Sequence, residues 1–118
     1  MTPMVPPPSA SADTMSDNRT DIAATFSANL VHYRKQLGIS QERLASLAGL
    51  HRTEIGLLES SSRLPRIDTV IKLAASLLIE PGDLLEGVNW LPSVEAPGGE
   101  FHCEDPRRLG ASGRRHAA

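Results

Sequence analysis

The side chains that most often carry out catalysis or bind metals are few in this sequence and do not cluster. The four histidines are scattered along the chain, and Cys103 is the only cysteine. One thiol excludes an intramolecular disulfide and a four-thiolate zinc site, and His102 beside it adds a single ligand where zinc needs three or four. The sequence also has no glycine-rich phosphate loop and no serine or cysteine with a plausible base. It therefore predicts a protein that is not an enzyme and needs no metal or cofactor.

The residues from Gln41 to Ser60 indicate a different chemistry, which depends on two short helices joined by a tight turn. Ala45 is small enough for the helices to cross closely, and Gly49 tolerates the positive φ that the turn requires. Apolar residues that can form the buried contacts recur at fixed offsets: Leu44, Ala48, Leu50, Ile55 and Leu58. In this arrangement the second helix can enter the major groove of DNA. Two amphipathic helices of an ordinary bundle are the alternative, which the number of constrained positions disfavours.

The wider segment from Phe26 to Leu85 resembles the Cro/C1-type helix-turn-helix family of prokaryotic transcriptional regulators, also called the xenobiotic-response-element family. The residues that carry the resemblance are Phe26, Asn29, Leu30, Arg34, Gly38, Ile39, Ser40, Gln41, Leu44, Ala45, Ala48, Gly49, Leu50, Ile55, Leu58, Glu59, Pro65, Leu73, Ala74, Leu84 and Leu85. The resemblance implies an all-α fold, with a compact five-helix domain like that of lambda repressor. It also implies sequence-specific binding to double-stranded DNA, usually by a homodimer on a palindromic operator.

The resemblance assigns roles to individual positions. Gln41, which opens the second helix, contacts a phosphate and braces the third helix, which is the recognition helix. Arg52 and Thr53 at the start of the recognition helix reach base edges, and Leu57 one turn later also faces the groove. The loop that follows touches phosphates through Ser60, Ser61, Ser62, Arg63 and Arg66. Arg34, late in the first helix, and Glu59, at the end of the third, form a structural ion pair.

Several of these positions have a second interpretation. Arg52 either makes a bidentate contact with guanine, worth ~1–3 kcal/mol of discrimination, or is solvated or bound to phosphate only. Thr53 reaches either a base or a phosphate, and Leu57 meets either a thymine methyl group or a neighbouring helix. His51 occupies the N-cap of the recognition helix, where serine or threonine would cap better. Its functional alternative is a phosphate contact.

Five short helices must position these residues. Caps, glycines and apolar periodicity predict helices over residues 20–37, 41–49, 52–59, 67–78 and 81–87. The inner face of the fourth helix is expected to carry Ile67, Val70, Ile71, Ala74 and Leu77. Two turns depart from the family pattern, because Ser60 and Ser61 follow the third helix and Leu78 ends the fourth where glycine is common.

The chain has 118 residues and a formal net charge of −2, which alone does not suggest nucleic acid. From Arg34 to Lys72, however, seven basic and four acidic residues give a local charge of about +3. Residues 1–19 are expected to form a disordered N-terminal tail and residues 20–87 the DNA-binding domain. Residues 88–118 are expected to be a C-terminal extension, mostly irregular and ending in a disordered tail, with short extended pieces conceivable at 88–94 and 100–103. Because no signal peptide and no apolar run of ~18 residues is present, we expect a cytoplasmic, nucleoid-associated protein without membrane contact.

These observations together predict a transcriptional regulator that acts by occupying an operator. An antitoxin-like module, which binds a toxin protein and its own promoter, is the first alternative. A module whose exposed recognition helix meets another protein instead of DNA is the second. One recognition helix reads too few base pairs to single out a site in a genome, so a homodimer is expected. The candidate dimer surface consists of Leu84, Leu85, Val88, Trp90 and Leu91.

Overall fold

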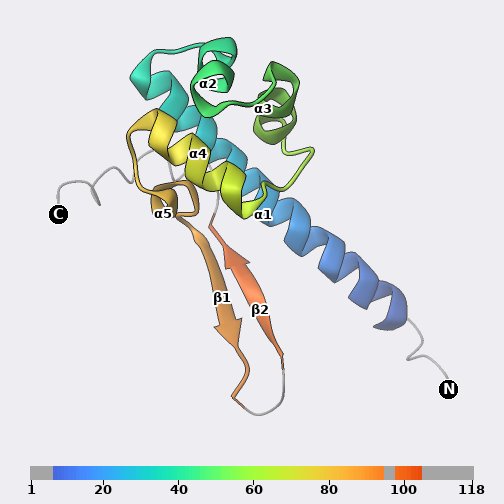
Figure 1. The fold of residues 1–118 in the computed structure, drawn as a ribbon. Helices are drawn as coiled ribbons and strands as arrows, with labels where there is room; N and C mark the ends of the chain where they lie inside the picture. Colours follow the sequence, from blue (N-terminus) through green and yellow to red (C-terminus); the bar gives the residue numbers. More distant parts are fainter. Residues whose placement is uncertain (1–6, 95–97, 105–118) are drawn as a thin grey trace, which may run out of the picture.

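The computed structural model describes residues 7–94 and 98–104, which form helices followed by a β-hairpin (Figure 1). The elements are α1 (Pro7–Leu37), α2 (Gln41–Ala48), α3 (Arg52–Glu59), α4 (Ile67–Leu77), α5 (Pro81–Leu84), β1 (Val88–Pro92) and β2 (Gly99–Cys103). In Figure 1 the helices α2 to α5 gather around the C-terminal half of α1, whereas the N-terminal half of α1 and the hairpin project from this body. None of the described helices is long and apolar enough to cross a membrane.

The hydrophobic core lies between α1 and the four shorter helices. Phe26 and Leu30 of α1 have no exposed surface, and every other helix contributes fully buried residues to the same cluster: Leu44, Ile55, Leu58, Leu73 and Leu84. Burying one such side chain contributes about 1.5–3 kcal/mol. Helices of eight residues are unstable alone in water, so this shared burial is what keeps α2 and α3 folded.

Three buried polar side chains of α1 attach other elements to it. Thr25 donates a hydrogen bond to the backbone carbonyl that follows β2, at 3.3 Å. Ser27 donates to the carbonyl of the last residue of α3. Asn29 donates through Nδ2 to two carbonyls at and just after the end of α5, at 2.9 and 3.0 Å. Because all three side chains are buried, these bonds fix the ends of the attached elements to α1, with the end of α3 on one side and α5 and the base of the hairpin on the other.

The hairpin corrects the prediction of an all-α fold and of a mostly irregular C-terminal extension, and its strands lie where short extended pieces were considered, at residues 88–94 and 100–103. β1 and β2 pair antiparallel, with Trp90 opposite Phe101, and their rings meet edge to face with centroids 4.9 Å apart. Since side chains alternate along a strand, Leu91 lies on the opposite face from Trp90, so the two cannot share one flat surface. Each strand has only five residues, too few for periodicity to separate a strand from a loop in the sequence.

A glycine allows the aromatic residue of β1 to lie close over β2. A Cβ atom added to Gly99 would lie 2.7 Å from the Trp90 ring and 2.4 Å from the carbonyl oxygen of Leu91. No side chain fits at this position without a shift in the strand. Two-stranded hairpins are marginally stable alone, and this one is held at its base by a bond from Glu104 N to Gly87 O at 2.9 Å.

The first and last helices differ in extent from the predicted ones. α1 begins at Pro7 instead of Thr20, so residues 7–19 are helical where a tail was expected. Proline is tolerated there because the first N–H groups of a helix have no intrahelical partner. α5 ends at Leu84, and this residue, expected on the dimer surface, is fully buried in the core. The tails expected at residues 1–6 and 105–118 lie outside the described residues.

The predicted inner face of α4 is only partly right, because Val70, Ala74 and Leu77 are buried as expected but the two isoleucines are not. Ile67 and Ile71 are 81% and 54% exposed, whereas Thr69 and Leu73 are buried. The apolar stripe of α4 is broad, running from Leu73 across Val70 and Ala74 to Ile71, so the sequence does not show which edge of the stripe is buried. Leu78, which follows α4, takes the left-handed conformation with φ 63°, where the family often has glycine.

Candidate nucleic-acid interface

The turn between α2 and α3 has the geometry expected from its residues. Ser40 caps α2 through its side chain, which accepts a hydrogen bond from the N–H of Arg43 in the first turn at 2.9 Å. Gly49 ends α2 in the left-handed region with φ 70°, and the next N–H, of Leu50, donates to Ala45 O at 2.9 Å. His51 then turns the chain into α3 with extended backbone angles. The predicted bounds of α3 are confirmed, and those of α2 to within its last residue.

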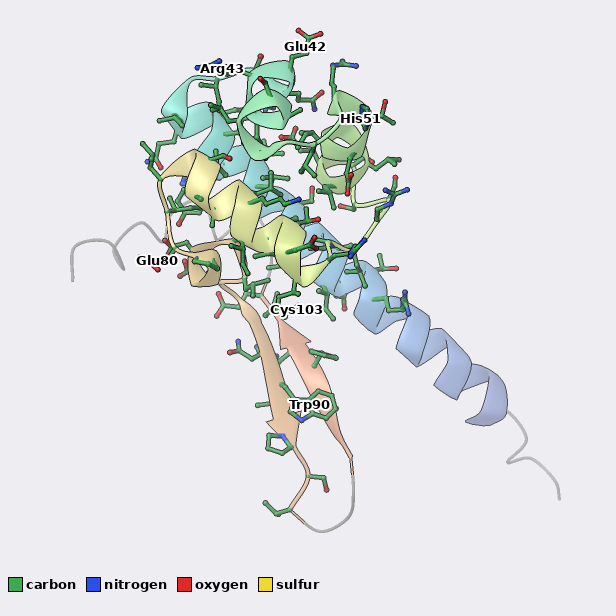
Figure 2. All side chains as sticks on the ribbon, viewed as in Figure 1. Glu42, Arg43, His51, Glu80, Trp90 and Cys103 are labelled. Atoms are coloured by element: carbon green, nitrogen blue, oxygen red, sulfur yellow. The ribbon has the colours of Figure 1, made fainter. Side chains whose placement is uncertain are left out.

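The third helix divides into a buried face and an exposed end. Ile55 and Leu58 have no exposed surface. Arg52 and Thr53 in the first turn are exposed. His51, which precedes them in the sequence, lies at the outer edge of the domain (Figure 2). Leu57 is partly buried. The free end of α3 therefore offers a guanidinium, a hydroxyl and an imidazole group to a partner.

The carboxylate of Glu59 is the centre of a hydrogen-bond network that joins three helices. Arg34 donates to both carboxylate oxygens, at 2.6 and 3.0 Å, and Gln41 Nε2 donates to one of them at 2.8 Å. The two charged side chains are 13% and 7% exposed, so the pair is largely shielded from water. Arg34 also donates to the carbonyl of Ile39 at 2.9 Å. The ion pair that the resemblance implied is present, and Gln41 shares the same carboxylate.

The loop after α3 carries hydroxyl and guanidinium groups on an irregular backbone. Ser61 takes a left-handed conformation with φ 65°, which replaces the glycine that is common in the family at this turn. The hydroxyl oxygens of Ser60 and Ser62 lie 2.8 Å apart. Arg63 and Arg66 are exposed, and Arg66 is only loosely paired, at 3.4 Å, with the carboxylate two residues on. Both guanidinium groups are accessible to an anion.

The sequence-based site residues therefore fall on three neighbouring segments: the first residue of α2, the first turns of α3 and the loop after it. Sequence reasoning assigned no role to Ser27, whose bond to the end of α3 helps to fix where this loop begins. Its one signal in the sequence is a polar residue directly beside Phe26 of the apolar stripe. Such a signal does not distinguish a buried serine from an exposed one.

Cys103 lies apart from this surface, where β2 meets the helical body (Figure 2). Burial raises the pKa of its thiol, the carboxylate of Asp21 raises it further, and a hydrogen bond with Thr25 lowers it. The thiol is therefore held in its neutral form, which is a poor nucleophile and metal ligand. Within residues 7–94 and 98–104, no three histidine, cysteine, aspartate or glutamate side chains gather as a metal site would require.

The chain is similar to known regulators over its helical part. Residues 31–84 match the family described as helix-turn-helix. The control protein C.SmaI of Serratia marcescens is 42% identical over 57 residues, which are 48% of this chain and 68% of that protein. The crystal structure of the restriction-modification controller protein C.AhdI from Aeromonas hydrophila superposes with a TM-score of 0.52 at 39% identity, covering 52% of this chain and 94% of the other.

A second solved structure agrees with this assignment. The hypothetical transcription factor NHTF from Neisseria is 31% identical, with a TM-score of 0.54 over 57% of this chain and 77% of that one. Identity above 30% over most of the length of these relatives, together with the turn geometry of α2 and α3, settles the family. The chain belongs to the Cro/C1-type helix-turn-helix family of DNA-binding transcriptional regulators.

Proposed function

We propose that this regulator reads operator DNA by inserting α3 into the major groove, with Arg52 as the main base-reading residue. The observation that carries the proposal is the division of α3, in which Ile55 and Leu58 are fully buried while Arg52 and Thr53 are exposed. An exposed guanidinium at this end of a recognition helix can bind guanine O6 and N7 together. Thr53 then reaches a base or a phosphate, and Leu57 one turn on meets a thymine methyl group.

Phosphate contacts on both sides of α3 would hold the helix in register. Gln41 donates one amide hydrogen to Glu59, which leaves its second amide hydrogen available for a phosphate. His51 at the N-cap of α3 supplies a second contact. Beyond the other end of α3 the exposed Ser60, Arg63 and Arg66 supply further contacts. Such contacts position a protein on DNA, whereas base contacts specify the sequence.

A homodimer would present two α3 helices to half-sites about 34 Å apart. The hairpin supports this assembly because Trp90 and Phe101 face the same side and are 50% and 39% exposed. Val88, nearer the body, continues the same apolar face of β1. Leu85, which is 42% exposed, lies close to the base of the hairpin and could extend this surface. The proposed dimer contact is therefore the Trp90 face of the hairpin.

A narrower role is favoured by the identity to C.SmaI and C.AhdI, which are named as control proteins. Control of the genes of a restriction-modification system is therefore the second candidate function. Identification of the genes that this protein regulates would test this role, because they would have to encode an endonuclease and a DNA methyltransferase. A neighbouring toxin gene whose product binds this chain would instead favour an antitoxin-like role.

The main proposal is tested by selecting binding sites from random duplex DNA with wild-type protein and with Arg52→Ala. We expect a palindromic consensus for the wild type and loss of preference at one position per half-site for the variant. Lys72→Ala, an exposed lysine on α4 assigned no DNA contact, is the matched control and should select the wild-type consensus. A wild type that enriches no sequence would refute the proposal.

A further inference from the structure

The N-terminal half of α1 and the loop after α3 together line a pocket of about 400 Å³. Arg19 and Thr20 contribute from α1, and Ser61, Ser62 and Arg63 contribute from the loop. In Figure 1 this loop runs from the end of α3 towards α4 beside the middle of α1. Two arginine side chains from distant parts of the sequence therefore line the same pocket, beside the recognition helix.

The chemistry of the pocket suits an anion. Arg19 and Arg63 are exposed, and neither forms an ion pair with any residue that the structure describes. The described lining contains no carboxylate, and the hydroxyl groups of Ser61 and Ser62 add hydrogen-bond donors. Two guanidinium charges outweigh the roughly half negative charge at the C-terminal end of α3. Guanidinium groups bind phosphate with good geometry, so phosphate is the anion that this set of donors fits best.

The position of the pocket relates it to DNA. Its loop residues directly follow α3, so a backbone phosphate beside the groove that α3 enters would lie at this side of the domain. Arg19 lies outside residues 31–84, the part that matches the helix-turn-helix family. It reaches the pocket only because α1 extends well before the matched region. The long first helix thereby adds a cationic group that the family match does not include.

We infer that Arg19 and Arg63 together clamp one phosphate of the operator backbone, outside the base pairs that α3 reads. The inference rests on the proposed function and adds a contact from α1 to it. The extended α1 thereby lengthens the footprint on DNA and raises affinity without changing sequence preference, because a phosphate carries no base identity. A free phosphate ion has the same chemistry, and the test must distinguish the two sources.

The first arm of the test measures operator binding by full-length protein over a range of salt concentrations. The clamp needs both arginines, so Arg19→Ala should release the phosphate in each protomer. The salt slope should fall by about one unit per bound protomer, and binding at 0.15 M salt should weaken at least about fivefold. Arg19→Lys keeps the charge and should recover most of the slope. Lys72→Ala is the control and should match wild type. If wild type binds its operator and Arg19→Ala has the same slope, the inference fails while the proposed function stands.

The second arm replaces single operator phosphates by neutral methylphosphonates. A neutral group at one flanking phosphate should weaken binding by the wild type. The same change should not weaken binding further by Arg19→Ala or Arg63→Ala, because these variants have already lost that contact. Arg52→Ala keeps both arginines of the clamp, so its binding should weaken there as the wild type's does. Inorganic phosphate is the probe for a free anion, followed through the amide resonances of Ser61 and Ser62. If these resonances shift at millimolar phosphate but no methylphosphonate position distinguishes Arg19→Ala from wild type, the pocket binds a free anion and the inference is wrong. A wild type that binds no DNA would overturn the proposed function itself.

Discussion

Arg34 donates two hydrogen bonds to the carboxylate of Glu59, through Nε at 2.6 Å and through Nη2 at 3.0 Å. The two residues are 25 apart in the sequence, on the helix that supports the domain and at the end of the helix proposed to read DNA. Gln41 donates to the same carboxylate, so the first residue of α2 belongs to this network as well. Glu59 therefore helps to set the orientation of α3, together with its buried residues Ile55 and Leu58.

Removing one partner of this pair should destabilise the protein strongly. Glu59→Ala leaves the Arg34 guanidinium largely buried without a counter-charge, and such a loss costs about 3–5 kcal/mol. Chemical denaturation followed by circular dichroism measures the change. Arg66→Ala breaks the exposed pair with Asp68 and should cost less than about 1 kcal/mol. Equal destabilisation by the two variants would show that the shielding of the Glu59 carboxylate is unimportant.

Base recognition and phosphate binding should separate in two arginine variants. Arg52→Ala should cost ~1–3 kcal/mol on the preferred operator and much less on random DNA. Arg63→Ala should weaken binding to both about equally and reduce the salt slope by about one unit per bound protomer. Fluorescence anisotropy with labelled duplexes at several salt concentrations measures both effects. If Arg52→Ala lowers the affinity for operator and for random DNA by the same factor, Arg52 is not the base-reading residue.

The motif itself could be predicted from the sequence because its constraints are local. Ser40 caps α2 and Gly49 ends it with a positive φ, and each effect depends on a residue type at one position. The family resemblance also placed Arg34 beside Glu59, which no periodicity would reveal. Which residues of α4 face solvent is not decided locally, because it depends on how α4 is rotated about its axis where it packs against α2 and α5.

The pairing of the two extended segments into a hairpin and the start of α1 could not be predicted for a related reason. Two five-residue strands gain stability only from their partner and from the helical body, including the bond between Thr25 and the carbonyl of Glu104. Residues 7–19 contain no apolar stripe that would distinguish a projecting helix from a tail. The pocket between Arg19 and Arg63 depends on both the length of α1 and the path of the loop, so neither arginine alone indicates it.

Relief of backbone strain after α4 should stabilise the protein. Leu78 takes a left-handed φ of 63° and is 80% exposed, so little buried surface offsets the conformational strain at this residue. Leu78→Gly removes that cost, which is about 1 kcal/mol, and should raise the midpoint of thermal unfolding. Leu78→Ala removes the same exposed side chain but keeps a Cβ, so it serves as the control and should raise the midpoint little. A Leu78→Gly protein that melts no higher than Leu78→Ala would argue against strain at this position.

The thiol of Cys103 should react slowly with alkylating reagents in the folded protein. Burial and the Asp21 carboxylate raise its pKa, so at pH 8 it has less thiolate than an ordinary cysteine and iodoacetamide should modify it more slowly. Asp21→Asn removes one of these causes and should speed the reaction. Because Cys103 is the only cysteine, mass spectrometry of the intact protein follows it directly, and denaturant should restore the rate of a free cysteine. A folded protein that reacts as fast as the denatured one would contradict the environment described for this thiol.

The proposed homodimer should depend on one face of the hairpin. Trp90 and Phe101 are paired across the strands and partly exposed on that face, whereas Asn89 and His102 point to the other. Trp90→Ala removes most of the exposed aromatic surface and should shift wild-type dimers towards monomers in sedimentation velocity, with and without operator DNA. Asn89→Ala changes the opposite face of the same strand and should leave the dimer intact.

Unfolding of the hairpin itself would also reduce dimerisation of Trp90→Ala. Trp90→Phe separates the two, because it keeps an aromatic ring against Phe101 and the apolar character of the face. We expect it to dimerise nearly as well as wild type. If wild type remains a monomer on DNA, or if Asn89→Ala and Trp90→Ala weaken the dimer equally, the contact lies elsewhere. The exposed Trp90 would then have to be explained by contact with a different partner.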